Sequence, residues 1–153
     1  PAADLPAELK VLDRMIGTWD TVSIQKPAEW TPSGGRSTAT VTREWILNGR
    51  FVMDTSLHSN GDESIAVLGY DPGQKTYRSW WFNSLGHRND SRGQWNEASK
   101  TLSWQTKLDD GKSMHTSVRF ADPNKENWQF QVTDDAGKTY LDMDITATRR
   151  KNQ

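Results

Sequence analysis

The amino-acid sequence predicts an all-β protein: an antiparallel, up-and-down barrel of about ten strands, preceded by one short helix. Three observations predict this class. After residue 17, apolar residues alternate with polar ones, which is the period of a strand with one buried face. Turn signals recur at intervals of about 8 to 12 residues. Only 33% of the residues are hydrophobic but eight are tryptophan, so large aromatic side chains must supply much of the buried surface.

The helix is expected over residues 6–16. Leu9, Leu12 and Met15 recur there at helical spacing, and proline is tolerated in the first helical turn. Gly17 ends the helix, because glycine is the usual residue just beyond a helical C-terminus.

Eight turn signals divide the rest of the chain, and they place about ten strands. The signals are Asn48-Gly49, Asn60-Gly61, Pro72-Gly73, Leu85-Gly86, Asn96 to Ser99, Asp110-Gly111, Asp122-Pro123-Asn124 and Asp134 to Gly137. The strands are expected at residues 18–26, 37–47, 50–58, 63–71, 75–84, 87–95, 100–108, 112–121, 126–133 and 138–149. Residues 27–36, with two prolines and two glycines, form a long loop.

A meander of this kind leaves two exposed edges unless its first and last strands pair, so we expect it to close into a barrel. In a closed barrel with an even number of strands, Trp19 lies beside Arg149 or Arg150. A guanidinium over an indole face contributes about 0.5–2 kcal/mol and would stabilise this structural seam.

Composition limits the function classes. The chain is short enough for a single domain, 1–153. With 19 Lys and Arg against 20 Asp and Glu, it has no field that favours nucleic acid or an anionic membrane. The absence of cysteine excludes disulfides, thiolate zinc sites and cysteine nucleophiles, and no apolar run approaches the roughly 18 residues of a membrane span. The first residues fit a signal-peptidase product or an artificial boundary equally well, so periplasmic, secreted and cytoplasmic locations stay open.

Several segments carry a resemblance to a known family. The opening Gly17-Thr18-Trp19 resembles the Gly-x-Trp start of calycins, the group that contains lipocalins and fatty-acid-binding proteins. The wider set resembles the bacterial family of unknown function numbered 1579 over nearly the whole chain: residues 12–19, 48–52, 68–71, Tyr77 with Trp81, and 93–102. This resemblance implies a calycin-like barrel and no established activity. Asn83 departs from the pattern, because the family more often has Asp there.

A second resemblance, to the haem-binding nitrobindin group, would imply a haem held by a histidine near the C-terminal end. The last expected strand contains no histidine; the three in the chain are His58, His87 and His115. A haem ligand would therefore have to come from another strand, and we expect no resident cofactor or metal.

The hairpin around Leu85-Gly86 indicates which residues face the interior. If Asn83 opposes His87, then Trp81 faces Asn89, and Ser79, Ser91, Tyr77 and Gly93 share the same face. The inward set of the second strand of the hairpin would then be His87, Asn89, Ser91, Gly93 and Trp95. This set is mostly small and polar where a filled core would need large apolar residues, which indicates a cavity. A slip of one residue would instead place Trp80 and Phe82 inside.

We therefore expect a non-enzymatic module that binds a small apolar or amphipathic molecule within the barrel. The candidate ligand-binding residues are Tyr77, Trp81, Asn83, His87, Asn89 and Arg119. Asn83 and His87 could equally belong to the barrel rim and bond each other or water. Arg119 could hold a carboxylate, although the apolar alternation of its strand favours an outward position. His58, beside a turn, is expected in solvent.

Two alternatives remain open from the sequence. One is an enzyme on the same barrel that uses His87, or Asp142 with Asp144, for proton transfer. Apolar residues alternate with this aspartate pair, which favours its facing water. The other is an interaction module with a filled core, in which Trp30 of the first loop meets a partner or a second subunit in a homodimer. The sequence contains no phosphate loop, nucleophile elbow or zinc-site spacing.

Overall fold

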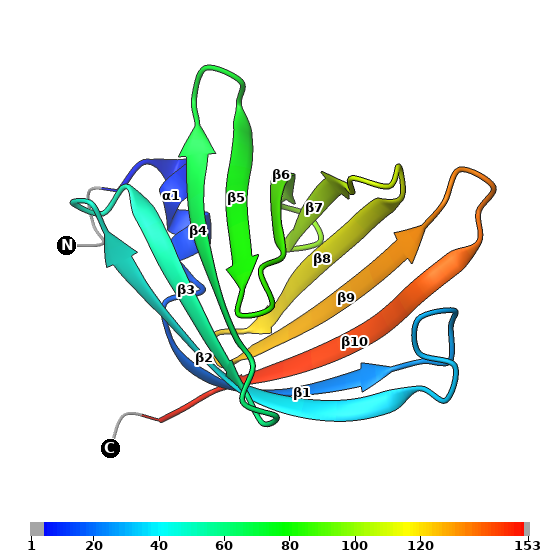
Figure 1. The fold of residues 1–153 in the computed structure, drawn as a ribbon. Coiled ribbons are helices and arrows are strands. Elements are labelled where there is room, and N and C mark those ends of the chain that lie inside the picture. Colours follow the sequence, from blue (N-terminus) through cyan, green and yellow to red (C-terminus); the bar gives the residue numbers. More distant parts are fainter. Residues whose placement is uncertain (1–4, 152–153) are drawn as a thin grey trace.

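The computed structural model describes residues 5–151, which form one short helix and a closed antiparallel barrel of ten strands (Figure 1). The elements are α1 (Ala7–Asp13), β1 (Gly17–Gln25), β2 (Gly35–Ile46), β3 (Phe51–His58), β4 (Glu63–Asp71), β5 (Thr76–Asn83), β6 (Arg88–Asn96), β7 (Thr101–Lys107), β8 (Ser113–Asp122), β9 (Lys125–Thr133) and β10 (Thr139–Arg149). The expected fold class is confirmed. No strand end differs from its sequence-based position by more than two residues.

The barrel closes through the pairing of β1 with β10, which lie side by side in Figure 1. Trp19 is the cross-strand partner of Arg149, as the sequence predicts, and the guanidinium carbon lies 4.3 Å from the indole centroid. The Trp19 Nε1–H donates to the carbonyl of Met15 at 2.9 Å. Arg149 donates to the carbonyls of Arg14, Ile16 and Pro123, so it ties the last strand to the segment after α1 and to the β8–β9 turn.

The helix α1 closes one end of the barrel. Its apolar face, with Leu9 and Leu12, packs into a buried cluster with Leu68 of β4 and Leu102 of β7. The helix ends at Asp13, three residues earlier than the sequence predicts, because the chain then turns and places Met15 in the barrel interior. Within residues 5–151, no helix is long and apolar enough to cross a membrane.

One glycine shapes the wall between β6 and β7. A Cβ at Gly93 would lie 2.8 Å from the ring of Trp104, its partner across the two strands. The missing side chain lets the indole lie against the backbone of β6, which brings Trp104 to the edge of the barrel interior. In the turn between β2 and β3, Asn48 and Gly49 both adopt positive φ, which these two residue types tolerate best.

Candidate ligand-binding cavity

The barrel encloses a cavity of about 370 Å³ with two unlike walls. Strands β3 to β6 contribute small polar side chains: Ser56, Ser64, Ser79, Asn89 and Ser91. Strands β8 to β10 contribute apolar side chains: Met114, Phe130, Leu141, Met143 and Ile145. The cavity therefore presents hydrogen-bonding groups on one side and a hydrophobic surface on the other.

The polar wall follows from the register of β5 and β6. Ser79 is the partner of Ser91 and Trp81 is the partner of Asn89, which is the register that the sequence predicts. All four line the cavity, whereas Phe82 lies on the outer face and is exposed. The short side chains of Ser79, Asn89 and Ser91 leave space that larger residues would fill, so the interior is not a filled core.

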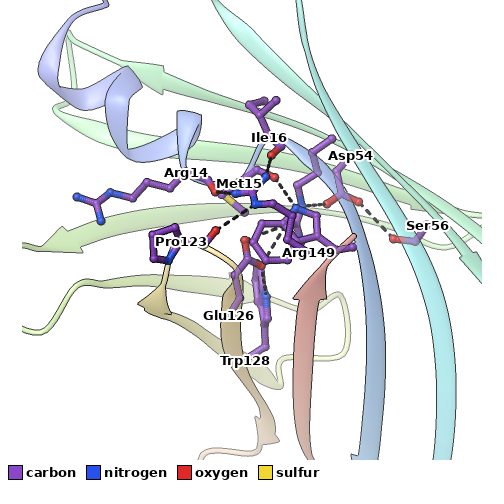
Figure 2. Close-up of polar contacts among 11 residues, drawn as sticks. Arg14, Met15, Ile16, Asp54, Ser56, Pro123, Glu126, Trp128 and Arg149 are labelled. Atoms are coloured by element: carbon purple, nitrogen blue, oxygen red, sulfur yellow. Dashed lines mark hydrogen bonds and ion pairs between the residues drawn. The ribbon is translucent and has the colours of Figure 1, made fainter. Parts of the chain in front are cut away.

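A charged cluster lies where the cavity meets the end closed by α1 (Figure 2). The Nε–H of Arg43 in β2 donates to Asp54 Oδ2 of β3 at 2.6 Å. Its Nη1 lies 3.0 Å from both carboxylate oxygens of Glu126 in β9. The exposed fractions are 4% for the Arg43 side chain, 0% for Glu126 and 17% for Asp54. The cluster thus joins β2 and β3 to β9, which are not neighbours in the sheet, and its side chains have little access to bulk water.

Aromatic side chains enclose this cluster. The Nε1–H of Trp128 donates to Glu126 Oε2 at 2.8 Å. The guanidinium carbon of Arg43 lies 5.5 Å from the ring centroid of Trp128 and 5.8 Å from that of Trp19. Burial lowers the pKa of Arg43, but the carboxylates of Glu126 and Asp54 outweigh burial, and the net effect raises the pKa. Arg43 therefore stays charged inside the barrel.

The candidate residues from the sequence divide into three groups. Trp81 and Asn89 line the cavity. Tyr77 is buried, but at the closed end, where its hydroxyl donates to the carbonyl of Glu8 in α1 at 2.8 Å. Asn83 and His87 lie at the β5–β6 turn, where Asn83 Oδ1 accepts from the backbone N–H of His87 and the two side chains are 3.2 Å apart. The pair thus has the rim arrangement that the sequence left as the alternative.

Arg119 does not reach the cavity. It lies on the outer face of β8 and is exposed, because its neighbours Val118 and Phe120 take the inward positions. Arg119 is consequently not placed to hold the carboxylate of a ligand in the interior. Arg43 is the arginine that lines the cavity.

The histidines and the aspartate pair also have defined places. His58 is half-buried and lines the cavity near the end of β3, so the expectation that it lies in solvent is wrong. His115 is exposed on the outer face of β8. Asp142 and Asp144 lie on the outer face of β10, where both approach Lys26 Nζ, at 3.6 and 3.2 Å. Among residues 5–151, no group of three or more potential metal ligands is placed to hold a metal ion.

Trp30 lies in the loop between β1 and β2, and 49% of it is exposed. Its ring is 5.9 Å from that of Tyr140, so it packs on the outside of the barrel near the start of β10. A dimer through this residue stays a prediction.

Arg43, Asp54 and Glu126 are not among the residues predicted from the sequence. A signal was present for two of them, because the alternation puts Arg43 and Glu126 on the inward faces of their strands, with Val41 and Trp128 respectively. Asp54 gave no such signal, because it shares its face with Ser56 and His58. A charged residue on an otherwise apolar face is unusual and indicates a buried partner.

The fold and the enclosed cavity together define a calycin-like barrel. The chain belongs to a family described as protein of unknown function (DUF1579), whose family model matches residues 6–149. No curated protein matches the chain.

Two solved structures show the same fold at low sequence identity. Rv2717c from M. tuberculosis is 14% identical with a TM-score of 0.71, and the match covers 97% of this chain and 100% of that one. The S-type phycobiliprotein lyase CPES from Guillardia theta is 11% identical with a TM-score of 0.62, and the match covers 99% of this chain and 97% of that one. At these identities the likeness shows a shared fold.

Proposed function

We propose that this protein binds a small apolar or amphipathic molecule inside its barrel. One observation carries the proposal: a cavity of about 370 Å³, with aromatic and aliphatic side chains on one side and polar groups on the other. Ligand sites in proteins generally have volumes of roughly 300–1,000 Å³ and this kind of lining. A protein that needed its interior only for stability would gain from filling such a space, because each buried void forfeits packing contacts.

The geometry indicates how a ligand would lie. His58, Met114 and Leu141 line the cavity from strand positions next to the turns at the end opposite α1. Entry therefore takes place at this open end, since α1 and its apolar cluster fill the other. An amphipathic molecule would place its polar groups against the polar side chains of β3 to β6 and its apolar surface against β8 to β10.

The proposal is tested by native mass spectrometry of the protein purified from its own host. We expect a bound species of low mass that organic solvent releases. Repeated spectra of the bare polypeptide alone would count against a resident ligand.

A pair of variants sharpens this test. Ser79→Phe puts a bulky ring into the cavity, whereas Ser103→Phe puts the same ring on the exposed outer face of β7. We expect Ser79→Phe to lose the bound species and Ser103→Phe to retain it. Thermal unfolding of both variants checks folding, because an added ring in a packed site costs about 1–3 kcal/mol. Equal occupancy in two folded variants would show that the ligand lies elsewhere.

A further inference from the structure

We propose that the polar group of the ligand is a cation, such as a protonated amine, and that it binds at Asp54. This inference rests on the proposed function, since it names the chemical class of ligand that the same cavity takes.

The charges next to the cavity do not cancel. Arg43 and Asp54 line it directly, and Glu126 lies immediately behind Arg43. One guanidinium therefore faces two carboxylates. Arg149 does not restore the balance at the cavity, because it lies against Trp19 and donates to three backbone carbonyls. His58 also lines the cavity, but near the open end.

The spare acceptor capacity belongs to Asp54. Both oxygens of Glu126 accept hydrogen bonds from Arg43 or Trp128, and this carboxylate has no exposed surface. Asp54 Oδ2 accepts from Arg43, but its Oδ1 accepts only a long bond, 3.3 Å, from Ser56 Oγ. A carboxylate has about four lone-pair positions, so Asp54 can accept further N–H donors from the cavity.

Arg43 is poorly placed to recognise an anion. Its Nε and Nη1 already bind the two carboxylates. Its Nη2 makes no hydrogen bond within residues 5–151, but a ligand carboxylate drawn to it would set three negative groups against one guanidinium. Charge in a poorly solvated site is costly unless it is paired, so the cluster disfavours an anion and favours a cation.

The aromatic lining supports the same ligand class. Trp81, Trp104, Trp128 and Phe130 all border the cavity. The face of an aromatic ring attracts a cation, and indole is the strongest of the protein rings in this respect. A cavity that holds both a carboxylate and several aromatic rings is suited to an amine attached to an apolar body.

The test compares three probes with the same chain: octylamine, octanoate and the uncharged octanol, titrated calorimetrically at pH 7.4. At this pH the amine is protonated and the carboxylic acid is ionised, as are lysine and glutamate side chains. We expect octylamine to bind at least about tenfold more tightly than octanoate, with octanol between them. We also expect octylamine not to bind the Ser79→Phe variant, because the added ring occupies the cavity that the amine would enter.

Two matched variants test whether Asp54 causes the preference for octylamine over octanoate. Asp54→Asn removes one charge from the cavity, and Asp90→Asn removes one from the exposed outer face of β6. We expect the first to reduce the octylamine-to-octanoate preference about tenfold and the second to leave it unchanged. If Asp54→Asn does not fold, the probe series on the unmodified protein decides alone.

The outcomes separate the two proposals. Octanol and octanoate binding as tightly as octylamine would overturn the cationic ligand and leave the apolar cavity function standing. Failure of all three probes to bind would overturn the proposed function, and the inference with it. An unchanged preference in folded Asp54→Asn would show that this carboxylate does not select the ligand.

Discussion

Replacing Arg43 by methionine tests whether the buried ion cluster holds the barrel together. The substitution keeps much of the side-chain volume but leaves Asp54 and Glu126 without their cation. Removing one partner of a buried ion pair costs about 3–5 kcal/mol, because the other charge stays buried and unpaired. Here one arginine serves two carboxylates and also lies near the rings of Trp19 and Trp128, so we expect the upper part of this range.

Urea unfolding at pH 7, followed by tryptophan fluorescence, measures this free-energy difference. Arg92→Met serves as control, because Arg92 is exposed on the outer face of β6 and bonds only Gln74 there. We expect the control to lie within about 0.5 kcal/mol of the unmodified protein. A deficit of Arg43→Met below about 1 kcal/mol would refute the expectation that the buried cluster holds the barrel together.

Two further predictions concern the closed end of the barrel. Trp19→Ala should cost about 3–5 kcal/mol, since the indole is 1% exposed and packs beneath Arg149 at the seam; an unchanged melting temperature would contradict that place. Tyr77→Phe should cost about 0.5–1.5 kcal/mol through the lost bond to Glu8. Burial, with smaller effects of Tyr70 and Glu8, raises the pKa of Tyr77 above its unfolded value near 10. The contribution of the Tyr77 hydroxyl to the free energy of unfolding is therefore full below pH 10 and is lost as the pH rises above it. The unfolding curves of the unmodified protein and of Tyr77→Phe should converge at alkaline pH.

The fold could be predicted from the sequence because its signals are local. Alternation fixes which face of a strand is buried, and the turns at Asn48-Gly49 and Leu85-Gly86 fix the register of each hairpin. Hairpin register also predicts one contact of the site, because Arg43 and Asp54 are direct partners across the β2–β3 hairpin. The turn at Asn48-Gly49 alone is enough to predict this pairing.

Depth along the barrel axis was harder to predict. Tyr77, Trp81 and Asn83 were correctly placed on one face of β5, yet the first lies under α1, the second borders the cavity and the third belongs to a turn. Residues on one face of a strand span about 6.6 Å for each pair of positions, so a shared face does not imply a shared site. The level of the cavity depends on how far α1 enters the barrel, which no local pattern encodes.

The contact between Arg43 and Glu126 could not be predicted either, because it joins residues 83 positions apart across the interior. It exists only once the barrel has closed with its observed register. This makes the cluster both a support of the barrel and the end wall of the cavity, so substitutions there should change stability and binding together. Asp54→Asn should change binding more than stability. The amide oxygen of Asn can still accept a hydrogen bond from Arg43, but the negative charge that would attract a cation is removed. If binding and stability separate at any position of the cluster, they should separate at Asp54.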